Sequence, residues 1–323
     1  MSSAQPPAAY AARRLAVHSL VEFAFSVPDL AEARHFYASF GLDVRGDAAE
    51  VSLYAHGHAH RWARVLPGPS KRLLWVSFGI HRGDLPAFEH HLAARGVAAI
   101  PAPAGAGNDG LWIAGPDGVP LQLRVADKPS LATPTRAVPA IDQRDVGRCP
   151  GRDRLPPTHP SHLSHILLFS SNVSDAVRFY GEVLGLRLSD RAGTAIAFMH
   201  TPHGGDHHLI AFARSDGPGL HHSSWCVQSI DELGAGAQQM RRAGYVEGWG
   251  IGRHVLGSNY FQYVRDPWGS YAEYSYDIDY IREGSSWTEK DHAAHDAIFA
   301  WGPEMPEDFI ANKETVKSAS SVA

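Results

Sequence analysis

The sequence predicts an α+β fold made of four βαβββ units, two in each half of the chain. Three features of its 323 residues support this prediction. Residues 127–160 are rich in Pro, Gly, Arg and Asp and show neither helical nor strand periodicity, which indicates a linker. The segments before and after this linker repeat the same order of strand and helix patterns. Each half also closes with a turn that contains Pro and Gly, followed by a last strand pattern.

The first unit of each half begins with an apolar strand that leads into a short amphipathic helix. The matching segments are SVPDLAEARHFYASFGLDV and SSNVSDAVRFYGEVLGLRL. Asp29 and Asn172 are suitable N-caps, because their side-chain oxygens can accept hydrogen bonds from free amides of the first helical turn. Gly41 and Gly185 are typical of a helix C-terminus. Alternating residues in AEVSLYAH and TAIAFMH then predict strands.

The second unit of each half repeats this order of a strand, a turn, a helix and a glycine. The matching segments are RLLWVSFGIHRGDLPAFEHHLAARGV and GLHHSSWCVQSIDELGAGAQQMRRAGY, with Asp84 or Asp231 in the turn. The last strands lie in GPDGVPLQLRV and DPWGSYAEYSY. Because paired βαβββ units can curl their sheets around a shared cavity, we expect inward-facing side chains to line one.

The repeat divides the chain into five expected segments. They are an N-terminal extension (1–16), a first paired domain (17–126), the linker (127–160), a second paired domain (161–280) and a C-terminal tail (281–323). The tail is rich in aromatic and acidic residues, and we expect it to be a lid over the cavity or a contact between subunits.

Composition excludes several classes of protein. The hydrophobic share of 44% and the charged share of 20% are typical of a soluble globular protein, and no apolar run approaches the ~20 residues of a membrane helix. The first residues lack the apolar core of a signal peptide, and the net charge of −5 argues against a nucleic-acid partner. Cys149 and Cys226 are too few for a disulfide framework, so we expect a cytoplasmic protein that binds neither membrane nor nucleic acid.

Two adjacent histidines, His221 and His222, open a predicted buried strand in GPGLHHSSW. Side chains alternate between the two faces of a strand, so we expect only one of these imidazoles to face a given cavity. A histidine that faces a sheet interior needs a partner, either a hydrogen-bonding group or a metal ion.

The segment GRHVLGSNYFQYVRDPWGSYAEY, residues 252–274, resembles the catalytic domain of type I extradiol ring-cleavage dioxygenases in the vicinal oxygen chelate superfamily. A His, a Tyr, an Asp-Pro turn and a Glu recur at this spacing in that family. The resemblance covers residues 161–280, and the duplicated architecture extends it to Val17. It implies two glyoxalase/bleomycin-resistance-like domains.

The resemblance implies metal ligands at His165, His222 and Glu273. Two imidazoles and one carboxylate from different strands form a facial triad that suits non-haem Fe(II), and Mn(II) fits the same ligands. His222 is then the ligand that faces the cavity and His221 points to the opposite face, with the reverse choice left open.

Three further residues match catalytic positions of that family. His208 matches the acid–base residue beside the O₂ site, with His207 and His203 as the alternatives in the same segment. His254 and Tyr263 match residues that hydrogen-bond the substrate oxygens. The implied activity is insertion of both atoms of O₂ into a substituted catechol, next to the diol, to give a muconic semialdehyde-type product in aromatic-compound catabolism. The alternatives are a metal-dependent glyoxalase or epimerase, or a non-enzymatic protein that binds an aromatic ligand.

The first half provides an internal comparison. Aligning the two halves places Glu22 against His165, Trp75 against His222 and Gln122 against Glu273. Glu, Trp and Gln do not form a transition-metal triad, so we expect the first half to be a metal-free copy.

The substrate follows from the expected pocket wall. Leu167 shares a strand face with His165, and together with Phe198 and Trp249 it predicts an apolar wall. Arg253 is the nearest arginine in sequence to the expected site, but no arginine is clearly placed to bind a carboxylate. We therefore expect neutral alkyl, aryl or hydroxyl substituents on the catechol.

We also expect the protein to be a homo-oligomer, either a dimer or a tetramer.

Overall fold

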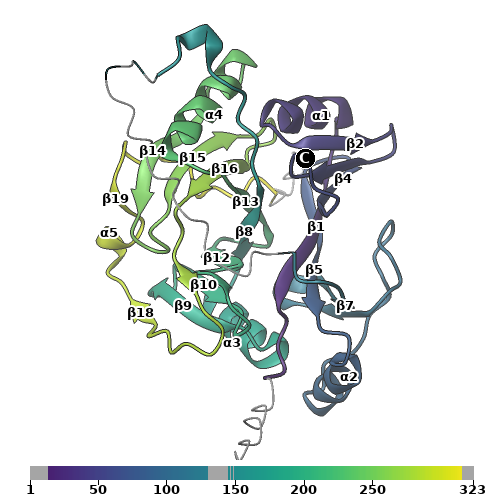
Figure 1. The fold of residues 1–323 in the computed structure, drawn as a ribbon. Coiled ribbons are helices and arrows are strands. Elements are labelled where there is room, and N and C mark those ends of the chain that lie inside the picture. The colour runs from purple at the N-terminus through teal and green to yellow at the C-terminus, as the bar shows by residue number, and fades with distance from the viewer. Residues whose placement is uncertain (1–13, 130–144, 146, 148, 315–323) are drawn as a thin grey trace, which may run out of the picture.

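The computed structural model describes residues 14–129, 145, 147 and 149–314, so half of the predicted linker and both ends of the chain lie outside the described residues. The fold is α+β, as predicted, and is built on two large sheets that lie side by side with helices on their outer faces, together with a small two-stranded sheet (Figure 1). The two sheets correspond to the two halves of the sequence repeat.

The first half forms a seven-stranded sheet. Its elements are β1 (Ser19–Val27), α1 (Leu30–Ser39), β2 (Asp43–Gly46), β3 (Val51–Tyr54), β4 (Arg61–Pro67), β5 (Arg72–Ile80), α2 (Leu85–Ala94), β6 (Leu111–Ala114), a 3₁₀ segment (Pro116–Gly118) and β7 (Pro120–Val125). In its second unit, the first strand after α2 is reduced to a single bridge between Ala99 and Ile113.

The second half forms a ten-stranded sheet. Its elements are a 3₁₀ segment (Arg152–Arg154), β8 (His162–Ser170), α3 (Val173–Leu184), β9 (Arg187–Ala192), β10 (Ile196–His200), β11 (Gly205–Asp206), β12 (Ile210–Arg214), β13 (Gly219–Cys226), α4 (Ile230–Arg242), β14 (Gly248–His254), β15 (Tyr260–Arg265) and β16 (Tyr271–Tyr276). None of the helices in the described part of the chain is long and apolar enough to span a membrane.

The centres of the two sheets share one topology. The order β4-β1-β5-β7 in the first sheet matches β12-β8-β13-β16 in the second. In both, the first pair is parallel, the middle pair is antiparallel and the last pair is parallel. The strand registers agree with the alignment made from sequence, because Glu22 pairs with Ser77 as His165 pairs with Ser224.

The predicted helix caps explain where the first helix of each half begins. The side chain of Asp29 accepts hydrogen bonds from the backbone amides of Ala31 and Glu32, and Asn172 accepts one from the amide of Asp175. Gly185 closes α3 in the left-handed conformation, with φ of 76°, which glycine adopts without strain. These caps fix the positions of the helices over the sheets.

The two halves share a continuous core. The ring of Tyr274 stacks on Phe40 of the other half at 3.9 Å, and its hydroxyl donates to the Phe40 carbonyl. Lys71 and Asp266 form a buried ion pair between the halves at 2.5 Å. Such contacts make the first half a structural support for the second.

The C-terminal tail lies along the second sheet and adds strands to it. Its elements are β17 (Tyr280–Ile281), β18 (Lys290–Asp291), α5 (Ala294–Ala297) and β19 (Phe299–Trp301). β17 pairs with β11 in a separate two-stranded sheet. β18 pairs with β9 and β19 pairs with β14, so the tail runs from one edge of the ten-stranded sheet to the other (Figure 1). This path carries it over the open side of the second half.

Candidate metal centre and active site

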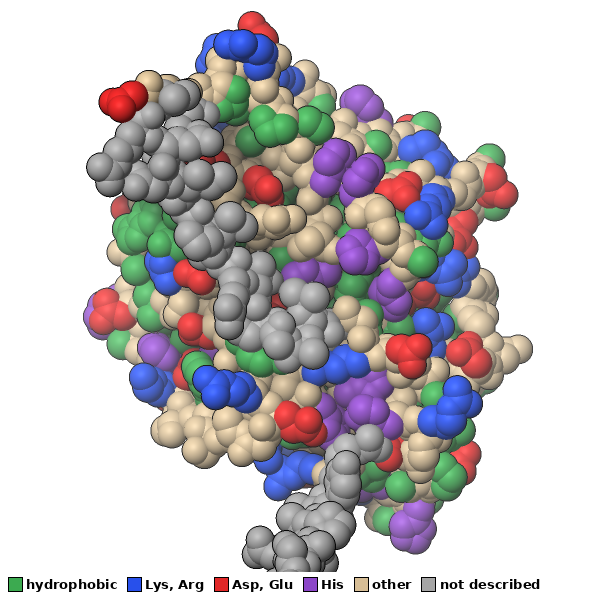
Figure 2. All heavy atoms as spheres, in the orientation of Figure 1, with side chains coloured by type: hydrophobic (Ala, Val, Ile, Leu, Met, Phe, Trp, Pro, Cys, Tyr) green, Lys and Arg blue, Asp and Glu red, His purple; other side chains and the backbone are tan. Residues whose placement is uncertain are grey.

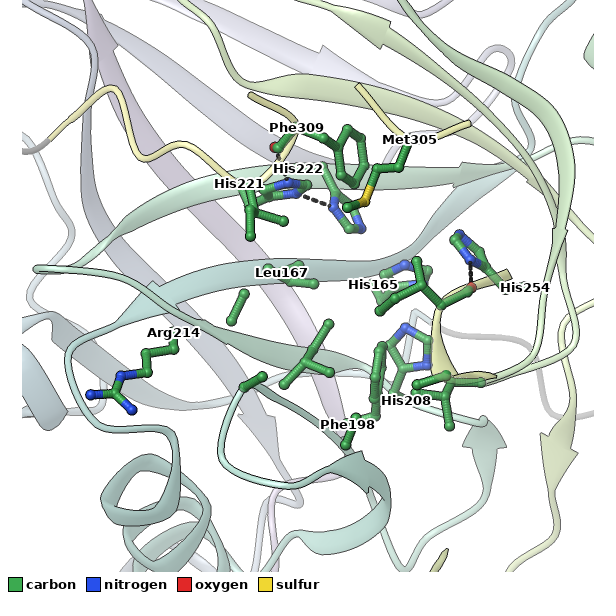
Figure 3. Close-up of a pocket in the computed structure, with 18 of the residues that line it drawn as sticks. His165, Leu167, Phe198, His208, Arg214, His221, His222, His254, Met305 and Phe309 are labelled. Atoms are coloured by element: carbon green, nitrogen blue, oxygen red, sulfur yellow. Dashed lines mark hydrogen bonds between the residues drawn. The ribbon is translucent and has the colours of Figure 1, made fainter. Parts of the chain in front are cut away.

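A cavity of about 360 Å³ lies inside the second half, under the tail. Figure 3 shows His165, His208, His222 and His254 turned toward this space from different strands and loops. Histidine content alone does not mark the site, because Figure 2 shows histidine side chains spread over one face of the molecule. The cavity is distinguished by four imidazoles that converge on one small volume.

Three strands bring His165, His222 and Glu273 together. The Nε2 atom of His165 lies 3.4 Å from Glu273 Oε2, and the Nε2 atom of His222 lies 3.5 Å from the same oxygen. All three side chains are buried, and their ligand atoms lie within 4.8 Å of one another. The sequence predicted this grouping from β8, β13 and β16, and the structure places the three residues at one point.

Two atoms of this group are left without partners. His222 Nε2 and Glu273 Oε2 are buried and have no hydrogen-bond partner among the described residues. A buried polar atom without a partner costs about 1–3 kcal/mol, so such atoms are rare unless a ligand satisfies them. The donor set and its unsatisfied atoms therefore fit a divalent cation held by two imidazoles and one carboxylate.

The position of His221 corrects the expectation from strand alternation. Both His221 and His222 line the cavity, because a β-bulge interrupts the pairing of β13 with β8 at His221. An extra residue in one strand redirects the side chains around it. His221 Nδ1 lies 2.7 Å from His222 Nδ1, and its Nε2 atom donates to the Phe309 carbonyl at 2.8 Å. Burial lowers the pKa of His221 to about 4, so this ring is neutral.

Asn259 holds the carboxylate in place and was not identified from sequence. Its Nδ2 atom donates to Glu273 Oε1 at 3.1 Å and to Ser275 Oγ at 3.0 Å. Glu273 Oε1 is thereby engaged, and Oε2 remains directed at the two imidazoles. An asparagine in a loop before a strand carries no recognisable signal in a single sequence.

His254 and Tyr263 form a hydrogen-bonded pair beside the metal-ligand group. Tyr263 Oη lies 2.9 Å from His254 Nε2, and His254 Nδ1 donates to the Ile298 carbonyl at 2.6 Å. Because Nδ1 carries the hydrogen of the neutral ring, the tyrosine hydroxyl donates to Nε2. Burial lowers the pKa of His254, and burial together with the negative charge of Glu273 holds the pKa of Tyr263 well above its ordinary value.

His208 is the histidine of its segment that reaches the cavity. Its ring lies 4.0 Å from that of His165, between centroids, and 4.8 Å from that of Phe198. Burial, followed by the nearby His165 and His207, holds the pKa of His208 well below its ordinary value, so the ring is neutral. His203, one of the alternatives from sequence, lies away from the cavity with its Nδ1 atom 3.5 Å from Glu283.

His207 lies directly behind His208 and links it to a carboxylate. The two Nδ1 atoms are 3.1 Å apart, and His207 Nε2 donates to Asp190 Oδ2 at 2.8 Å. A neutral His207 then accepts a hydrogen bond from His208 Nδ1. That arrangement leaves the Nε2 lone pair of His208 free to face the cavity.

The cavity wall is mainly apolar, but its composition differs from the expected one. Leu167 and Phe198 line it as predicted. Trp249 does not: its ring packs behind Tyr263 at 5.7 Å, and its indole N–H donates to the Pro303 carbonyl. The expectation for Trp249 is therefore wrong, because this side chain is buried in the aromatic layer behind Tyr263 and does not line the cavity.

The C-terminal tail supplies a part of the cavity wall that was not predicted from the sequence. The side chains of Ala297, Ile298, Met305 and Phe309 line the cavity from the tail, and Met305 and Phe309 lie beside His221 and His222 in Figure 3. The tail thus lies where a lid would lie.

No arginine lies near the metal-ligand group among the described residues that line the cavity. Arg214 is at the outer end, far from His208 and His254 in Figure 3. Arg253 does not line the cavity; its guanidinium lies 3.6 Å from Asp277 and stacks over Tyr260.

Comparisons with known proteins agree with this geometry. Residues 162–274 match the profile of the Glyoxalase/Bleomycin resistance protein/Dioxygenase superfamily. Metapyrocatechase 2 of Cupriavidus necator is 45% identical over 304 residues, which cover 93% of this chain and 94% of that protein. The two chains therefore correspond over nearly their whole length.

Two solved structures show the same fold. The Mn(II)-bound glyoxalase from Novosphingobium aromaticivorans is 26% identical with a TM-score of 0.68, covering 88% of this chain and 90% of that one. Homoprotocatechuate 2,3-dioxygenase from Arthrobacter globiformis is 19% identical with a TM-score of 0.73, covering 92% of each chain.

Proposed function

The chain belongs to the glyoxalase/bleomycin resistance protein/dioxygenase superfamily and is an extradiol ring-cleaving dioxygenase, and we propose that His165, His222 and Glu273 hold its catalytic metal, Fe(II). The observation that carries the proposal is the meeting of three ligand atoms within 4.8 Å, two of them buried without a partner. Mn(II) fits the same two imidazoles and one carboxylate. The bound metal would hold both oxygens of a catechol beside O₂ and lower the pKa of the bound hydroxyls.

The residues around the ligands support this role by their chemistry. Tyr263 can turn its hydroxyl hydrogen from His254 toward a substrate oxygen, and the two side chains then hold that oxygen next to Glu273. Leu167 and Phe198 form an apolar wall that excludes water and orients the aromatic ring.

His208 moves a proton at its Nε2 atom. Because its ring is neutral at rest, it accepts a proton from a catechol hydroxyl before it can act as an acid. The same proton is then available to a substrate oxygen later in the reaction. The first of these steps follows from the neutral, buried state of the His208 ring.

The alternative of a glyoxalase or epimerase is less favoured by the ligand set. Glyoxalases and epimerases of this superfamily often hold their metal with two glutamates, whereas Glu273 is the one carboxylate in this ligand group among the described residues. A homo-oligomer and a cytoplasmic location remain predictions from the sequence.

The experiment is to load the protein anaerobically with Fe(II) or with Mn(II), add a panel of catechols and admit air. We expect a yellow ring-cleavage product together with O₂ uptake, with Fe(II) more effective than Mn(II). O₂ uptake by protein that carries neither metal would contradict the proposed site. Higher turnover with Mn(II) than with Fe(II) would identify Mn(II) as the catalytic metal.

A further inference from the structure

Both histidines of the proposed triad come directly after a β-bulge. In β8 the extra residue is Ser164, since Trp225 pairs with Leu163 and Ser224 pairs with His165. In β13 the extra residue is His221, as described above. A bulge redirects side chains locally, and here it brings the side chain of the extra residue next to the ring of the histidine that follows.

Each bulge residue contacts the Nδ1 atom of its neighbour. Ser164 Oγ lies 3.2 Å from His165 Nδ1, and His221 Nδ1 lies 2.7 Å from His222 Nδ1. In both cases the other ring nitrogen, Nε2, faces Glu273. The two contacts are therefore on the side of the ring opposite to the proposed metal.

The hydrogens in these contacts follow from the outer partners. Ser164 Oγ donates to Asp206 Oδ2 at 2.6 Å, and a carboxylate only accepts, so the serine oxygen must accept from His165 Nδ1. His221 donates from Nε2 to the Phe309 carbonyl at 2.8 Å, so its Nδ1 atom accepts from His222 Nδ1. Both ligands are left with a free lone pair on Nε2.

We infer that Ser164 and His221 are positioning residues, which fix the orientation and the tautomer of the two metal-binding histidines. Asp206 completes one chain of hydrogen bonds, and the Phe309 carbonyl from the tail completes the other. The inference rests on the proposed function, because it assumes that His165 and His222 are ligands. Partners of this kind change metal affinity by about 10–100-fold when they are removed.

The first half has the same two bulges but carries apolar side chains on them. Its strands have bulges at the same two places, with Val21 matching Ser164 and Leu74 matching His221. Neither valine nor leucine can accept a hydrogen bond. The bulges therefore belong to the duplicated scaffold, whereas the polar side chains on them belong to the second half.

These two residues of the first half suggest the substitutions for a test. We expect Ser164→Val and His221→Leu to weaken Mn(II) binding by about 10–100-fold, measured as the dissociation constant at fixed pH from the electron paramagnetic resonance signal of free Mn(II). Ser164→Thr keeps the hydroxyl, and the amide oxygen of His221→Gln can accept from His222. Both should bind Mn(II) much more tightly than the apolar variants. Leu74→Gln is the matched control on the other half and should not change the dissociation constant.

Thermal unfolding of the metal-free variants verifies their folding. Should Ser164→Val fail to fold, Asp206→Ala removes the outer acceptor at a less buried position and should weaken binding in the same way. Apolar and conservative variants that bind Mn(II) equally well, or equally poorly, would overturn the positioning role. Glu273→Ala tests the triad separately, because stoichiometric Mn(II) in that variant would refute the proposed metal site itself.

Discussion

The two halves of this protein place different residues at the same three points of one scaffold. In the second half these points carry His165, His222 and Glu273, with two buried atoms that have no partner among the described residues. In the first half they carry Glu22, Trp75 and Gln122, at matching strand registers. The difference lies in how the buried polar atoms are satisfied.

The polar residues of the first half satisfy one another. Glu22 accepts a hydrogen bond from Arg61 at 2.6 Å, and Gln122 accepts one from Ser77 at 2.6 Å. Gln122 Nε2 also donates to the carbonyl of Asp109 at 2.6 Å.

Trp75 fills the remaining space against Trp112 in the first half. A duplicated fold thus keeps one copy closed by internal hydrogen bonds and packing, whereas the other copy keeps ligand atoms free. At the three matching points, unsatisfied polar atoms rather than histidine number distinguish the functional copy.

The largest expected effect is the loss of metal from the second half. Replacing His165, His222 or Glu273 by Ala should reduce the metal content from about one ion per chain to near zero, because two ligands do not complete the facial triad. Turnover should be lost with the metal. Elemental analysis after gel filtration gives the metal content, and a full complement of metal in any of these variants would remove that residue from the triad.

The matched changes in the first half serve as the control. Glu22→Gln, Trp75→Phe and Gln122→Leu should leave the metal content unchanged. Metal lost from one of these variants while the protein stays folded would show that the first half takes part in metal binding, against the comparison drawn above.

The next effect concerns the proton at His208, whose matching position in the first half carries Arg61, a residue that binds Glu22 instead. His208→Phe should keep the metal and slow turnover by roughly 10²–10⁴, the usual range for a positioned acid or base. His203→Phe is the control, because His203 lies outside the cavity beside Glu283. Single-turnover rates with a catechol measure whether His208 takes part in the chemical step. A normal rate for His208→Phe would make His207 the next residue to replace.

Local sequence patterns were enough to predict most elements of both halves. Helix caps such as Asp29 and Asn172, and the alternation in the strands, depend on neighbouring residues only. The repeat strengthened these predictions, because a weak pattern in one half was supported by the same pattern in the other. The strand lost before β6, reduced to the bridge at Ala99, left no clear signal in the sequence.

The site was predictable where it depended on residue type and not where it depended on irregular backbone. The triad residues were predicted because they match a family spacing, although both histidines come directly after a bulge. His221 was misplaced because strict alternation takes no account of a bulge. Asn259 and the tail residues Ile298 and Phe309 reach the site through loops, whose course cannot be read from periodicity.

The apolar wall of the second half sets the expected choice of substrate. Leu167, Phe198 and Ile298 line the cavity, and a carboxylate buried against them without a partner would cost several kcal/mol. A neutral methyl or phenyl group would instead gain about 25 cal/mol per Å² of buried area. Even a difference of ~2.8 kcal/mol corresponds to about a hundredfold in specificity.

We therefore expect alkyl-, aryl- or hydroxyl-substituted catechols to have a kcat/KM about a hundredfold above that of protocatechuate or homoprotocatechuate. A competition series under air, at fixed pH and with Fe(II) kept reduced, measures this ratio. If a carboxylated catechol is the best substrate, Arg214 at the outer end of the cavity is the first residue to replace. Arg253, suggested by the sequence, faces Asp277 instead.

The smallest expected effect tests whether the polar residues of the first half are structural. Gln122→Leu keeps a similar volume but leaves the hydroxyl of Ser77 without its acceptor and the Asp109 carbonyl without its donor. Leaving such buried groups unpaired should lower the free energy of unfolding by about 1–3 kcal/mol. The equivalent change in the other half, Glu273→Gln, should cost the metal-free protein less, because Glu273 Oε2 has no hydrogen bond to lose among the described residues. Urea unfolding of both metal-free variants measures the two values, and a larger loss for Glu273→Gln would mean that the second half also depends on its triad for stability.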